Sequence, residues 1–579
     1  MSPAPRSRLD SLAGVAFALC VLNVLLAHGN AWPTLWPAVE WRLAPELAPA
    51  VALIAIWALV GRRVPRRLEA VLAVVGTLWV VLHYIDVTVP AVLGRRINLY
   101  WDVPHLGAVL RMGGSAGATT RVLLVLAGGV LVLSIVYLIV RRCIDVLARG
   151  AEGRPGRGLM LAFAGVTLVS WLAQAVGGRP PAQLFAAPVS AMVVEQYRLL
   201  STALSRTAGA ERLGPGPTFA GTLAGLRGAD VLIVFAEAYG AVTLDRPEIA
   251  RALDGHRARL AAAIAASGRQ VVSARLVSPT FGGASWLAHA GLLSGLDMRA
   301  PADYQLLLTT DRPTLVRHFA ENGYRTVGWL PGIQLPWPEG AFYGFDRYAD
   351  AGRIGYGGRP FGFWRIPDQA SMALIHAQEF GGDFLTTDDA NIGSGAGATA
   401  GTAGDADRTG NEASPGPRPP IEGGAVRPSR LIVFATVTTH APFRVLPPYS
   451  DDWVSLLGPE AFSAEEVQAA EAVPTSWSNP LPAYIASMRY QFDWLADYLA
   501  RHAPADLVTI VIGDHQPIGT VSGPDQPWEV PVHVITDNPA LLERFESAGF
   551  VAGLHPPADP LGPTHALTPI LIDAFDRTD

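Results

Sequence analysis

Lysine is absent from this chain of 579 residues, so all 44 basic residues are arginine. We interpret this as a bias of genome composition and draw no function from it. Cysteine is nearly absent as well, because Cys20 and Cys143 are the only two in the chain. After residue 143, therefore, neither a disulfide framework nor a cysteine-based metal site can form.

Charged residues are also scarce and unevenly distributed. They make up 16% of the chain, against about a quarter in ordinary soluble domains, and the deficit lies almost entirely before residue 180. The net charge of −6 argues against the basic stripe that a nucleic-acid surface needs, so no nucleic acid is expected as a partner. This distribution predicts a membrane region followed by a soluble domain.

Five apolar runs account for the missing charge. They predict five transmembrane helices within residues 1–177, at Leu9–Ala27, Leu47–Gly61, Ala70–Val89, Val122–Val140 and Gly158–Val176. Four runs reach the ~20 residues that a spanning helix needs, and the second is expected to extend back toward Trp41. Because four more spans follow and no small-residue cleavage site is evident, we interpret the first run as an uncleaved anchor.

The placement of arginine predicts the orientation of these helices. Arginines cluster between the second and third runs and between the fourth and fifth, whereas Arg42 is the only one between the first and second. Since positive residues favour the cytoplasm, the N-terminus should lie inside and residues 223–579 outside an inner (plasma) membrane. Residues 178–222 should form a connector, with an amphipathic helix around Met192–Ser205 along the membrane surface.

Strand and helix signals alternate after residue 223. Six segments have the continuous apolar character of strands buried on both faces of a parallel sheet: Asp230–Ala236, Gln270–Val277, Thr326–Leu330, Arg430–Thr436, Leu507–Ile512 and Val530–Ile535. Helical segments such as Tyr484–Arg501 fall between them. The predicted fold class is α/β: the membrane region is followed by a sandwich with a mostly parallel sheet. Residues 386–428, rich in Gly, Ala, Asp, Ser and Pro, predict a disordered insertion.

Polar side chains suited to a metal ion follow three of these strands. Glu237 follows the first strand, Asp514 and His515 follow the fifth, and Ser285 comes after the second at the start of an apolar helix. Ligands bind at the carboxyl ends of such strands, so these residues should converge. Two carboxylates and an imidazole suit one divalent cation, Mn²⁺ or Zn²⁺ before Mg²⁺ or Ca²⁺. Ser285 could also coordinate the cation and act as a nucleophile.

Each of these residues also has an ordinary structural interpretation. A Glu or an Asp-His pair at a strand end is usually a surface polar group, and a Ser after two glycines is usually a helix cap. Their position after buried strands favours a site instead. No second set of metal ligands is evident, because His533 and His565 are better explained as structural or exposed residues.

Four motifs in this order resemble the lipoteichoic acid synthase type of phosphoglycerol transferase, within the alkaline phosphatase/sulfatase superfamily. They are the strand Val231–Gly240 (VLIVFAEAYG), the nucleophile segment Gly283–His289 (GASWLAH) followed by Leu293–Gly295, Thr438–Phe443 (TTHAPF) and Val511–His515 (VIGDH). The five preceding membrane helices also fit, so the resemblance covers nearly the whole chain.

The resemblance implies a role for each matched residue. Glu237, Asp514 and His515 would hold the metal, Ser285 would form a covalent intermediate, and His440 would bind the head group or oxyanion and assist proton transfer. This sequence departs from the family at two positions, where Ser285 replaces a usual Thr and His289, a candidate for substrate binding, replaces a frequent Glu.

The sequence thus favours a transferase that moves phosphoglycerol or phosphoethanolamine from a membrane lipid donor to an envelope glycan or lipid. A phosphate or sulfate ester hydrolase would use the same residues, and an inactive envelope receptor is a third interpretation. Ordinary arylsulfatase activity is disfavoured, because the Cys-x-Pro-x-Arg segment is absent. Asp368 could contact substrate or serve as the N-cap of a helix.

Overall fold

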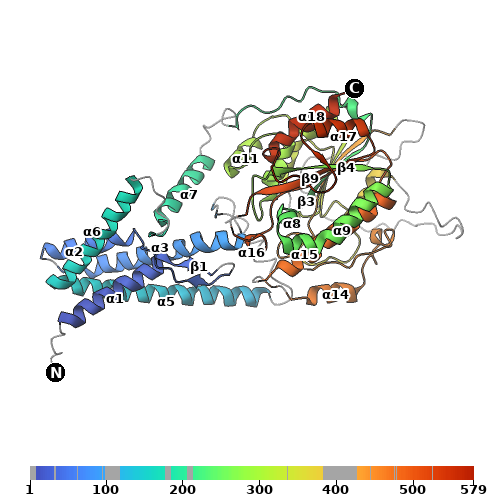
Figure 1. The fold of residues 1–579 in the computed structure, drawn as a ribbon. Coiled ribbons are helices and arrows are strands. Elements are labelled where there is room, and N and C mark those ends of the chain that lie inside the picture. Colours follow the sequence, from blue (N-terminus) through green and yellow to red (C-terminus); the bar gives the residue numbers. More distant parts are fainter. Residues whose placement is uncertain are drawn as a thin grey trace, which may run out of the picture.

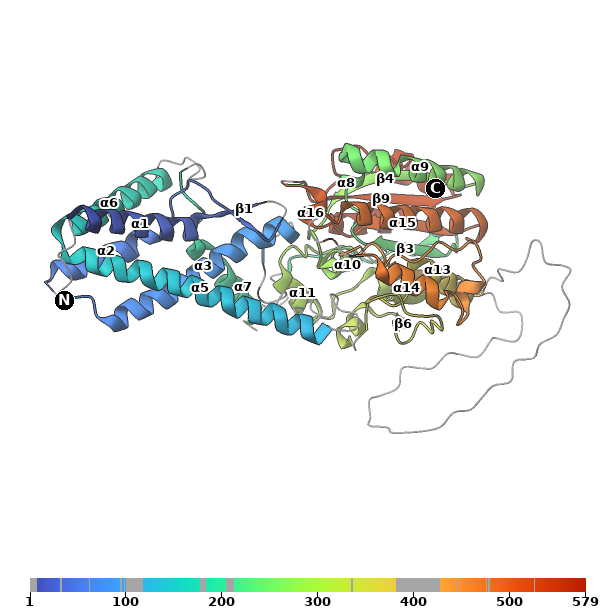
Figure 2. The ribbon, with the colours of Figure 1, turned by 90° about the horizontal axis from the view of Figure 1, so that it is seen from below.

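The computed structural model describes residues 8–31, 34–61, 63–93, 96–97, 99, 118–176, 184–204, 213–334, 337–381, 427–443, 445–474, 476, 479–524 and 526–578. All but the last two residues of the predicted insertion at 386–428 lie outside the described residues. Helices form the N-terminal part of the chain, and an α/β domain forms the rest (Figures 1 and 2).

The N-terminal helices occupy all five predicted apolar runs. Their bounds are α1 Arg8–Ala27, α2 Leu47–Leu59, α3 Arg66–Leu93, α5 Ala118–Glu152 and α6 Arg154–Val176. A small hairpin of β1 (Gly29–Asn30) and β2 (Pro37–Ala38) joins α1 to α2. The predicted connector helix is present as α7, Val189–Leu204.

The predicted number of five membrane spans is not confirmed. Among the described residues, two helical stretches are long and apolar enough to cross a membrane, Arg66–Val92 and Arg154–Gln174. The apolar stretch Leu12–Ala27 within α1 and the helix α2 are shorter. At 1.5 Å per residue, the 13 residues of α2 rise only about 20 Å, less than the ~30 Å hydrocarbon core.

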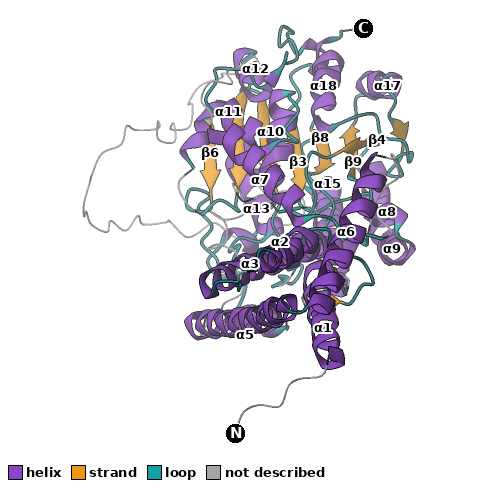
Figure 3. Ribbon diagram, turned by 90° about the vertical axis from the view of Figure 1, so that its left-hand side faces the viewer, coloured by secondary structure: helices purple, strands orange, loops and turns teal. Residues whose placement is uncertain are grey.

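An eight-stranded sheet forms the centre of the α/β domain (Figure 3). Its order is β10-β4-β9-β8-β3-β7-β5-β6. The strands are β3 Val231–Ala236, β4 Gln270–Val277, β5 Arg325–Leu330, β6 Arg347–Asp350, β7 Arg430–Ala435, β8 Val508–Gly513, β9 Glu529–Thr536 and β10 Val551–Ala552. All six predicted strands are present, and the block from β8 to β6 is parallel. The mostly parallel sheet is confirmed, although β9 runs antiparallel to both its neighbours.

Helices cover both faces of the sheet and complete two hydrophobic cores. One core contains residues of α9, α13 and α15, and the other contains residues of α10, α12, α17 and α18. The helices of the domain are α8 Val242–Asp245, α9 Pro247–Ala266, α10 Ser285–Ser294, α11 Pro301–Leu307, α12 Leu315–Glu321, α13 Asp368–Ile375, α14 Ala464–Ala472, α15 Leu481–Arg501, α16 Gly519–Ser522, α17 Pro539–Ser547 and α18 Leu567–Asp576.

Packed helices join the helical part to the α/β domain. Helix α3 packs against α16, and α7 packs against α11. The short helix α16 begins four residues after His515. The carboxyl edge of the sheet, where the predicted site lies, therefore faces the N-terminal helices (Figure 1).

Candidate metal centre and active site

Neighbouring strands bring Glu237 and Asp514 together. Strands β3 and β8 are paired in parallel with Ala236 opposite Gly513, so the residues that follow leave the sheet at the same level. Both carboxylates are buried, with 7% of Glu237 and 1% of Asp514 exposed. The register of two parallel strands thus places two acidic side chains side by side, as the sequence predicts.

Ser285 reaches this point although β8 and β9 separate its strand, β4, from β3. After β4 the chain turns toward the end of β8. The Gly282 N–H donates to the carbonyl of Gln516 at 3.0 Å, and the Ser278 hydroxyl donates to the carbonyl of Asp514 at 2.5 Å. Gly282 and Gly283 have positive φ angles of 64° and 136°, a region that glycine adopts without steric cost. Helix α10 then begins at Ser285.

The Ser285 hydroxyl lies between an acid and an imidazole. Its Oγ donates to Glu237 Oε2 at 2.9 Å and lies 3.2 Å from His515 Nε2. His515 Nε2 in turn lies 3.2 Å from Glu237 Oε1 and 3.7 Å from Asp514 Oδ2. The four predicted residues therefore form one compact cluster.

The cluster fits a metal ion. Among the residues that the structure describes, Glu237, Asp514 and His515 are the one group of three potential ligands that could hold an ion, with ligand atoms all within 4.8 Å of one another. Asp514 Oδ1 accepts the N–H groups of Ala238 and His515, whereas the buried Oδ2 makes no hydrogen bond to the described residues. His515 Nδ1 contacts the Gln516 carbonyl at 2.7 Å, which leaves the Nε2 lone pair for a ligand bond.

The electrostatics of the cluster also favour a cation. Burial and the nearby Glu237 carboxylate raise the pKa of Asp514 well above its ordinary value. Burial alone would raise the pKa of Glu237 too, but His440 and His515 outweigh it and lower that pKa. Burial lowers the pKa of His515, but Asp514 and Glu237 outweigh burial and raise it to about 9. Two buried carboxylates in contact need positive charge, which a divalent cation supplies.

Two threonines that the sequence analysis did not assign fix the main chain of Glu237. Its N–H donates to Thr436 Oγ1 at 2.9 Å, and its carbonyl accepts from Thr439 Oγ1 at 2.6 Å. Thr439 belongs to the TTHAPF motif, which is the one sequence signal that could have identified it.

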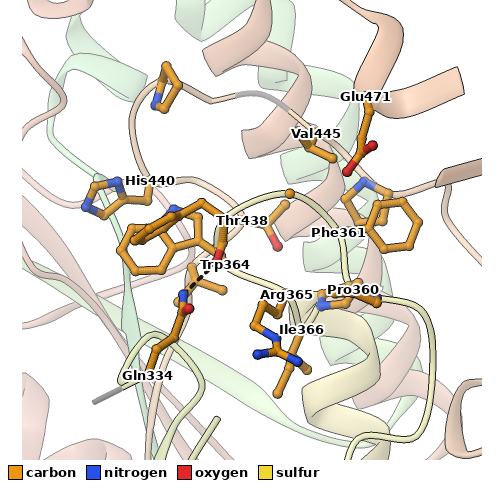
Figure 4. Close-up of a pocket in the computed structure, with 16 residues that line it drawn as sticks. Gln334, Pro360, Phe361, Trp364, Arg365, Ile366, Thr438, His440, Val445 and Glu471 are labelled. Atoms are coloured by element: carbon orange, nitrogen blue, oxygen red, sulfur yellow. Dashed lines mark hydrogen bonds between the residues drawn. The ribbon is translucent and has the colours of Figure 1, made fainter. Parts of the chain in front are cut away.

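His440 lies in the wall of a cavity of about 410 Å³ (Figure 4). Its ring packs on Trp364, with centroids 4.4 Å apart, and Arg365 and Gln334 also line the cavity. This volume is in the range of small-molecule pockets. His440 also lies close enough to Glu237 to lower the pKa of that acid. The segment that lines the pocket also contacts the candidate metal cluster, because Thr439, the residue before His440, donates to the Glu237 carbonyl.

His289 lies one helical turn after Ser285 on α10. Its ring packs on Phe235, with centroids 4.2 Å apart, and its buried Nε2 has no hydrogen-bond partner among the described residues. Burial lowers the pKa of His289 to about 4, and the charges of Glu237 and His515 also act on it. His289 is thus beside the cluster, and a contact with substrate stays a prediction.

Asp368 does not have the N-cap position that one of the two sequence interpretations gave it. It is the first residue of α13, whose N-cap is Pro367, so the N-cap interpretation is wrong. The side chain is fully buried, and its two oxygens accept the N–H groups of Val437 and Thr438 at 2.8 and 2.9 Å. Asp368 therefore contacts the segment that leads to His440, and a contact with substrate stays untested.

His533 is structural, as the sequence analysis expects. Its Nε2 lies 3.0 Å from the Tyr239 hydroxyl and its Nδ1 lies 2.6 Å from the Ser273 hydroxyl. Burial, with smaller contributions from Arg257 and His555, lowers the pKa of His533 to about 3. The ring is therefore neutral in the folded protein.

No family model matches the chain, and no curated protein matches it either. The solved structures that match the chain include the following two. The lipoteichoic acid synthase LtaP from Listeria monocytogenes matches at 12% identity with a TM-score of 0.32, over 58% of this chain and 70% of that one. A protein of the alkaline phosphatase superfamily from Vibrio parahaemolyticus matches at 13% identity with a TM-score of 0.31, over 58% and 67%. At these scores the likeness carries no argument about activity.

Proposed function

We propose that this chain is a membrane-anchored, metal-dependent transferase. It moves a phosphorus-containing head group, phosphoglycerol or phosphoethanolamine, from a lipid to an envelope glycan or lipid through a covalent intermediate on Ser285. The observation that carries this proposal is the Ser285 hydroxyl, held 2.9 Å from Glu237 and 3.2 Å from His515 within a group of buried metal ligands. A serine hydroxyl is a weak nucleophile unless its surroundings activate it.

Each residue of the cluster has a defined task in this reaction. Glu237, Asp514 and His515 would hold one divalent cation, which lowers the pKa of a coordinated oxygen and offsets the carboxylate charges. In the first step the Ser285 alkoxide, having lost its proton to solvent, attacks phosphorus. A bond forms between Ser285 Oγ and phosphorus, the bond from phosphorus to the lipid oxygen breaks, and His440 protonates that oxygen.

The second step reverses these roles. The acceptor hydroxyl gives its proton to His440 and attacks the same phosphorus, and the bond to Ser285 breaks. The cavity beside His440, walled by Trp364 and Arg365, would hold the head group during both steps. A guanidinium and an imidazole suit the anionic oxygens of a phosphodiester.

The helical part supports a lipid as donor. In the two candidate spans only 17% and 22% of the apolar window is buried, whereas a core helix of a soluble protein would bury most of it. Several large apolar residues of α3 and α6 face outward, which suits contact with lipid. Because α3 packs against α16, a lipid in the surrounding outer leaflet would lie close to Ser285.

The test uses the full chain in liposomes that contain candidate phospholipids. We expect Ser285→Ala to abolish release of diacylglycerol and Ser285→Thr to retain it, because either hydroxyl can form the intermediate. Mass spectrometry should find the head-group adduct on Ser285. Ser294→Ala is the matched control, since Ser294 lies at the other end of α10 and donates only to the Ala290 carbonyl among the described residues.

Two results would overturn parts of this proposal. Turnover by Ser285→Ala at the parent rate, or an adduct on Ser278 or Thr280, would exclude Ser285 as nucleophile. Release of free head group to water, with none on an added glycan or lipid acceptor, would make the protein a hydrolase. The hydrolase uses the same residues, with water in place of the acceptor hydroxyl.

A further inference from the structure

The carboxylate of Asp368 has no task in the reaction proposed above, although its burial is complete. Three hydrogen bonds join this residue to a segment 69 and 70 residues further along the chain. Its two oxygens accept the N–H groups of Val437 and Thr438, and its own N–H donates to Thr438 Oγ1 at 3.3 Å. A buried carboxylate is costly unless its surroundings compensate it, and the N–H groups of Val437 and Thr438 supply that compensation here.

The segment that Asp368 holds carries two contacts of the site. Strand β7 ends at Ala435, and the N–H of the next residue, Thr436, still donates to the Phe235 carbonyl of β3. Thr439 then donates to the carbonyl of Glu237 at 2.6 Å, and the His440 ring packs on Trp364. The placement of His440 therefore depends on how the backbone at Val437 and Thr438 is held.

Only a carboxylate satisfies both N–H groups in this geometry. Val437 and Thr438 present consecutive donors, and each reaches a different oxygen of Asp368. An asparagine has one acceptor oxygen, and its NH₂ group would face the second donor. Burial raises the pKa of Asp368 to about 6, while the bonds from Val437 and Thr438 act to lower it, so the side chain is charged at neutral pH.

The preceding residues hold His440 from its other side. Trp364 lies four residues before Asp368 in the same segment, and its ring forms the surface on which His440 packs (Figure 4). Phe361 and Arg365 exchange two backbone hydrogen bonds, which closes this segment into a tight turn. One stretch of chain thus fixes both the ring of His440 and the backbone that carries it.

We infer that Asp368 is a positioning residue that sets the place of His440 by fixing the backbone of Val437 and Thr438, and that it does not itself bind substrate. The effect on turnover rests on the proposed function, in which His440 moves protons. The effect on the backbone does not rest on the proposed function, because hydrogen exchange measures it without any substrate.

The first measurement is hydrogen exchange of the full chain in detergent, comparing the parent with Asp368→Asn. We expect the amide of Val437 or Thr438 to exchange at least tenfold faster in the variant. Asp230→Asn is the matched control, because Asp230 is also buried and accepts the N–H of Arg430 at 2.7 Å, at the opposite end of β7. The control should leave residues 437 and 438 unchanged. Unchanged exchange there in Asp368→Asn would overturn the inference.

The second measurement is a double-mutant cycle with His440→Ala, using liposomes of the donor lipid. If Asp368 acts through His440, Asp368→Asn should lower kcat about tenfold in the parent and have no further effect on His440→Ala. Equal fold losses in both backgrounds, or a rise in KM with kcat unchanged, would assign Asp368 a direct contact with substrate. Metal content should match the parent, since Glu237, Asp514 and His515 are untouched. A parent without turnover would refute the proposed function and leave the exchange result standing.

Discussion

Replacing Asp514 by asparagine separates the two tasks of its carboxylate. Oδ1 accepts the N–H groups of Ala238 and His515 at 2.8 and 2.6 Å, whereas Oδ2 faces the cluster without a hydrogen bond to the described residues. The asparagine carbonyl can accept both backbone bonds, and its NH₂ group takes the place of Oδ2. The strand ends should therefore keep their positions, while the metal loses one ligand and one negative charge.

The expected change in metal affinity is large. Substitution of groups that merely support metal ligands costs about 10–100-fold in affinity. Loss of a ligand should exceed this, so we expect the Kd for Mn²⁺ to rise more than about 100-fold, or ~2.7 kcal/mol. Without metal, the substitution should no longer lower the stability of the folded protein. Because burial and Glu237 raise the pKa of Asp514, a neutral amide removes an unfavourable charge, and the variant should melt at or above the parent temperature.

The assay is thermal unfolding of the full chain in detergent, with chelator or with Mn²⁺. At 100 times its Kd, a ligand that binds only the folded state stabilises it by about 2.7 kcal/mol. The parent should therefore melt higher with Mn²⁺, and Asp514→Asn should respond little. Asp230→Asn is the control, because Asp230 precedes β3 and lies about 20 Å along the strand from Glu237. An equal rise with Mn²⁺ in parent and Asp514→Asn would refute the assignment of Asp514 as a ligand.

Three further predictions concern topology and stability. A fluorescent protein fused after the last residue should stay dark if the C-terminus is outside, and a fluorescent fusion would contradict both the topology and the envelope function. His533, with its pKa lowered to about 3, takes up a proton below pH ~6.5 only when the chain unfolds. The contribution of His533 to the free energy of unfolding should be constant above that pH and fall by at most ~1.4 kcal/mol per pH unit between pH 6.5 and 3. In His533→Gln the melting temperature should depend less on pH across that range. An unchanged dependence on pH would exclude His533 as its cause. Glu379 is 1% exposed and pairs with Arg325 and Arg347. Glu379→Ala should therefore destabilise the fold by about 2 kcal/mol. A melting temperature equal to that of the parent would show that the arginines find other partners.

The strands of the fold could be predicted because they are buried on both faces. A strand such as β3 is apolar at every position, and its bounds are within two residues of those expected. Strands β6 and β10 were missed because four and two residues are too few to form a pattern. The antiparallel direction of β9 was missed as well, because an apolar run carries no information about strand direction. The number of five membrane spans stays unconfirmed, because length and composition qualify two stretches among the described residues.

The convergence of the candidate metal ligands could be predicted because each follows a strand. The carboxyl ends of parallel neighbours meet at one edge, so Glu237, Asp514 and His515 needed only the correct strand assignment. Asp368 differs, because its partners are 69 and 70 residues away and its local sequence is that of a helix start. The wall of the cavity formed by Trp364 and Gln334 likewise joins segments with no shared sequence signal.

The sequence by itself therefore determined which segments are buried, in what order they occur, and which ionisable residues stand at their ends, because these properties are local. Only the tertiary structure decided that the segment from β4 to Ser285 passes the end of β9 and places Ser285 beside Glu237. The same holds for the hydrogen bond from Thr439 to the Glu237 backbone and for those from the segment before His440 to Asp368. These contacts depend on how distant parts of the chain pack against one another, which local apolar patterns leave undetermined.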